Sequence, residues 1–128
     1  PSAVQGTNAQ LVQTVAGRAH AWALRKGMTG TPQQIGIAEH GYAQRLLDRY
    51  QVMFGDTGLQ TEISVIRGAE VRYGTGGSIR LDVLQGNVAD PTTIYDYKFG
   101  GSGLTARRIN EIRSVGGYPT VLIIEVRP

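Results

Sequence analysis

Hydrophobic residues follow two different rhythms along this chain. They recur at spacings of three and four from Asn8 to Lys26 and again from Pro32 to Phe54, which is the period of an amphipathic helix. Further on, apolar residues alternate with polar ones over Thr61–Arg67, Ser78–Leu84 and Thr93–Phe99. The pattern predicts two helices followed by a three-strand meander.

Capping signals stand at the ends of both predicted helices. Thr7 with Gln10, and Thr31 with Gln34, each fit a capping box. Gly27 suits the residue that follows the first helix, because glycine adopts the left-handed conformation that often ends a helix. We therefore expect the first helix to begin near Asn8 and the second just after Thr31.

The last part of the chain predicts a strand–helix–strand unit. Thr105 is a suitable N-cap for a short helix that ends at Gly116. The following run, Thr120–Val126, is almost continuously apolar, as in parallel strands that are covered on both faces. We expect this strand to be buried and parallel to Thr93–Phe99. The predicted fold class is α/β, with a central mixed sheet of about four strands.

Glycine-rich segments divide the predicted strands. Gly68 is interpreted as a β-bulge, with Val71–Tyr73 continuing the pairing, and Gly100-Gly101 closes the third strand. Gly74–Gly77 is interpreted as a hairpin turn. It is not a phosphate-binding loop, since it lacks the lysine of that motif and no helix follows it.

Composition describes an ordinary globular chain with a basic balance. It has 128 residues, 41% of them hydrophobic and 18% charged, and no cysteine. No apolar run approaches about 18 residues, so we expect no membrane segment. The formal charge is +3, and arginine dominates the thirteen basic residues, which permits a nucleic-acid partner. The start lacks methionine and a basic n-region, so we interpret it as the edge of a piece of a longer protein, not as a signal peptide.

The strand Thr93–Phe99 carries the first candidate site. Its alternation places Tyr95, Tyr97 and Phe99 on one face, where we expect core packing. Asp96 and Lys98 share the other face, and nothing about burial requires an acid and an amine there.

A second acid is expected opposite the first. If the hairpin is centred near Val88–Ala89, Asp82 lies almost opposite Asp96, with Cβ atoms roughly 4.5–5.5 Å apart. Carboxylates this close repel unless a proton or a cation lies between them, and hard oxygen ligands suit Mg²⁺ or Mn²⁺. Lys98 could stabilise charge that develops at phosphorus. The competing interpretation is a surface ladder of ion pairs.

Two further polar residues lie on or beside the predicted helix stripes. Glu39 falls inside the apolar stripe of the second helix, where it either completes the metal shell or lies at the rim with its carboxylate in water. His20 lies beside the stripe of the first helix, and we interpret it as a partly exposed residue at the core edge. His40 receives no role.

These residues resemble the PD-(D/E)XK nuclease superfamily. The matching motifs are Arg80-Leu81-Asp82-Val83 and Tyr95-Asp96-Tyr97-Lys98-Phe99-Gly100, with Glu39 on the helix before them. The resemblance implies a single nuclease domain over residues 1–128. Its restriction-endonuclease-like core would span about residues 32–127, preceded by an extra N-terminal helix and loop. Leu81 precedes the first acid where proline often stands in this family.

The resemblance also implies site roles. Asp82 and Asp96 would bind Mg²⁺ or Mn²⁺ together with the backbone carbonyl of Tyr97. Lys98 would position the attacking water, and Glu39 would assist the metal shell. Outside the resemblance, three basic residues are candidates for contacts with nucleic-acid phosphates, with solvated faces as the equal alternative: Arg80, Arg107 and Arg108.

The run from Tyr95 to Gly100, followed by an arginine-bearing helix, is also similar to the C-terminal nuclease toxin domains of bacterial polymorphic toxins. This implies an antibacterial effector used in interbacterial competition. Such an effector is delivered from the producing cell as part of a larger protein, acts in the cytoplasm of the target cell and has a cognate immunity protein. DNA is the first expected substrate, ahead of RNA. Two alternatives stay open, a non-catalytic nucleic-acid-binding module of the same fold and an enzyme acting on another phosphate ester.

Overall fold

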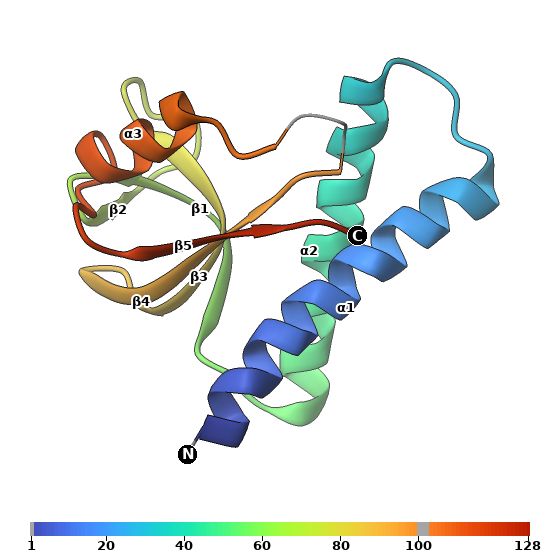
Figure 1. The fold of residues 1–128 in the computed structure, drawn as a ribbon, viewed down its shortest axis with the longest axis horizontal. Coiled ribbons are helices and arrows are strands. Elements are labelled where there is room, and N and C mark those ends of the chain that lie inside the picture. The colour runs from blue at the N-terminus through green and yellow to red at the C-terminus, as the bar shows by residue number, and fades with distance from the viewer. Residues whose placement is uncertain (1, 100–102) are drawn as a thin grey trace. The chain divides into compact units, whose positions relative to one another are not determined.

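The computed structural model describes residues 2–99 and 103–128, with side chains from Asn8 onward, and the chain forms two compact units (Figure 1). The helical unit holds the described residues up to Thr57 together with those of the segments Tyr97–Gly103 and Val126–Pro128. The sheet unit holds Gly58–Asp96 and Leu104–Glu125. The two units are described separately below. Within the described residues, no helix combines the length and the hydropathy needed to cross a membrane.

Two long helices, α1 (Ser2–Lys26) and α2 (Pro32–Phe54), pack together in the helical unit. Trp22 of α1 stacks on Tyr42 of α2, with ring centroids 4.4 Å apart. The shared core is made mainly of small and β-branched side chains that allow close approach of the backbones: Val12, Val15, Ala16, Ala19, Ala23, Ala43 and Leu47.

Local signals set the helix ends with one exception. The capping box of Thr31 and Gln34 is confirmed, with both reciprocal hydrogen bonds present. Gly27, at φ 61°, ends α1 as expected; its N–H donates to the Leu24 carbonyl and that of Met28 to the Ala23 carbonyl. The predicted start of α1 is wrong, because the helix begins at Ser2 and runs through Thr7.

The sheet unit is a five-stranded mixed sheet with the order β2-β1-β3-β4-β5, in which β5 runs parallel to β4 and the other neighbours are antiparallel. Helix α3 (Ala106–Ser114) connects β4 to β5, and Thr105 caps it as predicted. Ile112 of α3 packs into the core with Leu84 and Ile94. The strand bounds are β1 Leu59–Ile66, β2 Ala69–Val71, β3 Ile79–Asn87, β4 Asp90–Tyr97 and β5 Leu122–Val126. The predicted α/β class is confirmed.

Three details of the sheet differ from the sequence prediction or lie beyond it. Gly68 is not a bulge but the second residue of a two-residue turn, with Arg67 at φ 50° and Gly68 at φ 76°, as in a type I′ hairpin. The expectation that β5 would be buried on both faces is wrong, because β5 forms an edge of the sheet and Leu122 is 58% exposed. The predicted closure of β4 at Gly100-Gly101 lies outside the described residues.

Candidate functional site

The β3–β4 hairpin brings the two predicted acids to the same level of the sheet. Leu84 lies opposite Ile94 and Val83 opposite Tyr95, where the ladder ends, and Asp82 and Asp96 are the next residues on the two strands. Both acids are buried, with 9% of Asp82 and 2% of Asp96 exposed. A register shift between Gln85 and Gly86, which the hairpin prediction did not include, brings the two acids to this common level.

A third acid, absent from the predicted site, lies in the same row. In the β1–β3 pairing Thr61 lies opposite Val83 and Ile63 opposite Leu81, so Glu62 and Asp82 lie between these two pairs. The carboxylate groups of Glu62 and Asp82 each offer an oxygen, and these two oxygens lie within 4.8 Å of one another. Three adjacent strands thus each contribute one carboxylate, from Glu62, Asp82 and Asp96.

Glu62 also has an unusual backbone. Its φ of 50° lies in the left-handed region, which costs a non-glycine residue on the order of 1 kcal/mol. Strained residues of this kind concentrate at functional sites, where the surrounding structure holds them in place. Here the strain occurs within a paired strand, next to the Asp82 carboxylate.

Two arginines neutralise part of this acidic row. Arg80 Nε lies 3.1 Å from Glu62 Oε2, and Arg108 Nε lies 3.2 Å from Asp96 Oδ1. Arg108 Nη2 also donates to the Arg80 carbonyl at 2.6 Å. Both had been predicted to contact phosphates or to lie on solvated faces. In the structure Arg80 and Arg108 lie beside acids, the Arg80 side chain is 48% exposed and Arg107 is exposed on α3, so the phosphate contacts stay a prediction.

Lys98 and Tyr97 belong to the helical unit and are described there. The Lys98 N–H donates to the Val126 carbonyl at 2.9 Å, and its side chain is half-buried. Tyr97 is 3% exposed and stacks near Phe99, with ring centroids 5.5 Å apart. The ring of His40 meets both aromatic rings edge-on, at 5.7 and 5.1 Å. The expected core role is confirmed for Tyr97, whereas Phe99 is only half-buried, and His40 lies beside both rings.

Glu39 is buried and paired inside the helical unit. Only 3% of its side chain is exposed, and Oε2 lies 2.9 Å from Nδ1 of His20. The interpretation of Glu39 as a rim residue with its carboxylate in water is therefore wrong. His20 is 43% exposed, as expected for the core edge. The sequence did not predict the pairing of His20 with Glu39, although the two residues lie on or beside the facing stripes of α1 and α2.

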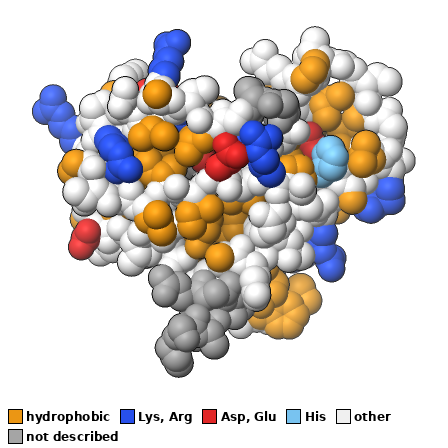
Figure 2. Space-filling model, in the orientation of Figure 1, with side chains coloured by type: hydrophobic (Ala, Val, Ile, Leu, Met, Phe, Trp, Pro, Cys, Tyr) orange, Lys and Arg blue, Asp and Glu red, His pale blue; other side chains and the backbone are white. Residues whose placement is uncertain are grey.

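Charge is distributed unevenly between the units. The helical unit carries seven lysines and arginines against three acids, a formal charge of +4, whereas the sheet unit carries six against seven, a charge of −1. On the face seen in Figure 2, basic side chains are scattered and do not form one patch. Glu62, Asp82 and Asp96 therefore lie in the unit that by itself is not basic, whereas Glu39 lies in the basic one.

Comparison of the chain with models of known protein families, with curated proteins and with solved structures finds no match in any of the three.

Proposed function

We propose that the chain is a metal-dependent nuclease that hydrolyses phosphodiester bonds of nucleic acid. The observation that carries the proposal is the approach of carboxylate oxygens of Glu62 and Asp82 to within 4.8 Å of one another. Carboxylate oxygens on neighbouring rigid strands are the ligands that Mg²⁺ and Mn²⁺ prefer. The donor set therefore fits a hard divalent cation.

A divalent ion held by these acids would lower the pKa of a bound water and polarise the phosphodiester. Asp82 supplies an anionic oxygen beside Glu62, and Arg108 holds the Asp96 carboxylate in one orientation. Arg80 limits the repulsion between Glu62 and its neighbours.

The resemblance adds three assignments to this proposal. The Tyr97 carbonyl would be a further oxygen ligand, Lys98 would position the attacking water, and Glu39 would assist. Since the Glu39 carboxylate already pairs with His20, we assign Glu39 to the stability of the helical unit. The larger context of an antibacterial effector tip with a cognate immunity protein follows from the resemblance alone. It predicts that expression of the chain arrests growth of a bacterial host.

One observation favours the alternative of a non-catalytic nucleic-acid-binding module. Asp96 already has a guanidinium partner in Arg108, as a structural acid would have. That alternative predicts binding of nucleic acid without binding of Mn²⁺.

The test compares cleavage with metal binding. Plasmid DNA and total tRNA are incubated with the chain in Mg²⁺ or in EDTA, and Mn²⁺ binding is measured separately by electron paramagnetic resonance. We expect cleavage only with metal, and a loss of about 100-fold or more in Asp82→Asn and Glu62→Gln. Both variants should also bind Mn²⁺ more weakly.

The matched control is Glu70→Gln, which removes an exposed acid from the neighbouring strand β2. It should cleave and bind Mn²⁺ like the unmodified chain. Cleavage in EDTA, or undiminished cleavage by Asp82→Asn and Lys98→Ala, would refute the mechanism. Circular dichroism of each variant shows whether a loss of activity reflects a loss of folding.

A further inference from the structure

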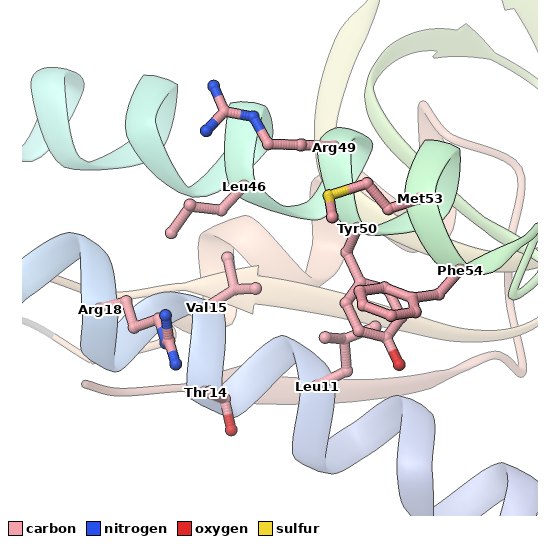
Figure 3. A pocket seen from close by; sticks show the side chains of 9 residues that line it. All are labelled: Leu11, Thr14, Val15, Arg18, Leu46, Arg49, Tyr50, Met53 and Phe54. Atoms are coloured by element: carbon pink, nitrogen blue, oxygen red, sulfur yellow. The ribbon is translucent and has the colours of Figure 1, made fainter.

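A hollow lies between α1 and α2 of the helical unit, and its lining includes no residue used in the proposed chemistry. Its cavity volume is about 450 Å³, within the range of sites that bind small molecules or single residues of a polymer. Figure 3 shows side chains of both helices around it. Apolar side chains, including Leu46 and Met53, form most of its wall.

Two aromatic rings lie at one end of this groove. Tyr50 and Phe54 are one helical turn apart on α2, and their ring centroids are 4.8 Å apart with a tilt of 39°. Phe54 is 70% exposed and Met53 is 66% exposed, although both line the cavity. Tyr50 is half-buried, so the exposed Phe54 ring is the main surface that can receive a flat ring from a partner.

Two arginines line the same groove from opposite helices. Arg18 of α1 and Arg49 of α2 both lie farther along the helices from the aromatic pair (Figure 3). None of the residues that line the cavity is acidic, and the helical unit carries a formal charge of +4. The groove therefore combines an apolar, partly aromatic floor with cations suited to phosphate.

We propose that this groove binds one unstacked nucleotide of a single-stranded nucleic acid. The base would lie on Tyr50 and Phe54, while Arg18 and Arg49 contact the adjoining phosphates. An aromatic surface with flanking cations is how proteins bind single strands without reading their sequence, and a base inside a duplex cannot offer its face. The inference rests on the proposed nuclease function and deepens it, since it names single-stranded substrate.

The experiment measures binding without catalysis. Fluorescently labelled (dT)8 and (U)8 are titrated with the complete chain in EDTA at low salt, and anisotropy is recorded. We expect both strands to bind more tightly than an eight-base-pair duplex. Phe54→Ala should weaken binding about tenfold, in line with the loss of one stacking contact.

Charge is tested with a double variant. Arg18→Gln/Arg49→Gln should weaken binding and reduce the slope of log affinity against log salt by about 1.4, as expected for two single-strand phosphate contacts. The matched double variant Arg25→Gln/Arg45→Gln removes the same charge from the same helices, at residues that do not line the cavity. Val52→Ala, at a position 86% exposed, is the control for Phe54→Ala.

Three results would overturn the proposal that the groove binds a nucleotide. The first is equal loss of binding in the groove variants and their controls. The second is binding of the duplex as tightly as the single strands. The third concerns decanoate, an amphipathic anion that is titrated in the same way. If Phe54→Ala weakens the binding of decanoate but not that of (dT)8, the ligand of the groove is an amphipathic anion and not a nucleotide.

Failure of the groove and failure of the nuclease are separable. If cleavage requires metal but is unaffected by Phe54→Ala and by Arg18→Gln/Arg49→Gln, the nucleotide-binding role of the groove is refuted and the nuclease function stands. If the groove variants weaken the binding of single strands but the chain cleaves nothing in Mg²⁺, the nuclease function is refuted and the nucleotide-binding role of the groove stands.

Discussion

Arg108 binds Asp96 with its Nε 3.2 Å from Oδ1, and its Nη2 donates to the Arg80 carbonyl at 2.6 Å. One side chain from α3 thus holds an acid of β4 and the backbone of β3 together, beside the end of the ladder at Val83 and Tyr95. The side chain of Asp96 is 3% exposed and that of Arg108 is 20% exposed. This ion pair is therefore mostly withdrawn from water, where a lost partner is costly.

Replacement of Arg108 by a neutral residue should destabilise the sheet unit. We expect Arg108→Gln to lower the free energy of unfolding by about 2–4 kcal/mol, because Asp96 would keep its buried charge without this guanidinium. Asp96→Asn should cost less, since an amide carries no charge to desolvate. Urea denaturation followed by circular dichroism measures both changes. Arg107→Gln, at the exposed neighbouring position, should change stability by less than about 0.5 kcal/mol, and an equal effect at both positions would contradict this role.

The His20–Glu39 contact should stabilise the packing of α1 on α2. His20→Ala removes the partner that lies 2.9 Å from the buried Glu39 carboxylate, so we expect a loss of about 1–3 kcal/mol in unfolding free energy. Glu39→Gln should restore part of that loss in the His20→Ala background, because it removes the buried charge. Gln10→Ala, an exposed change on the same helix, is the control. Additive effects of the two substitutions would show that the contact contributes nothing.

Two buried tyrosines should make stability depend on alkaline pH. Burial raises the pKa of Tyr95 and of Tyr118 above the ordinary value of 10.0. The folded chain therefore keeps these protons at a pH where the unfolded chain releases them. Their contribution to stability is complete below about pH 10 and falls as pH rises further.

The measurement is urea denaturation at a series of pH values from 8 upward, with phenolate absorbance recorded in parallel. Tyr95→Phe should weaken the alkaline decline in stability, at the cost of the hydrogen bond to Gln85 Oε1. Tyr73→Phe, at a position 71% exposed, should leave the decline unchanged. An identical pH profile for Tyr95→Phe and Tyr73→Phe would rule out this origin.

Local chemistry made part of the fold predictable. The capping box at Thr31 and Gln34 and the glycine at position 27 act over a few residues, and both appear in the structure where the sequence placed them. Thr7 failed as a predictor because a residue that can cap a helix can also lie within one, as it does in α1.

Long-range pairing set the limits of prediction for the site. The turn alone would place Asp82 opposite Tyr95, but a register shift between Gln85 and Gly86 moves the β3–β4 ladder by one residue, and the sequence carried no signal for that shift. Glu62 was missed because the β2 hairpin intervenes between β1 and β3, and no local signal sets the register across it. The exposure of β5 likewise depends on its place at the sheet edge, and a continuous apolar run does not encode that place.

Gly117 should be irreplaceable for a reason that burial alone does not reveal. Its φ is 82°, and a Cβ added there would lie 2.7 Å from Cα of Arg67 in the β1–β2 turn. Gly117→Ala therefore combines backbone strain with a backbone clash, and we expect a loss of about 2–4 kcal/mol in unfolding free energy. Gly17→Ala is the matched control, since it lies within α1 with open space around its Cβ position and should gain about 0.5–1 kcal/mol. Thermal and urea denaturation measure both variants, and a loss at Gly117 no larger than about 0.5 kcal/mol would show that the turn at Arg67 moves aside.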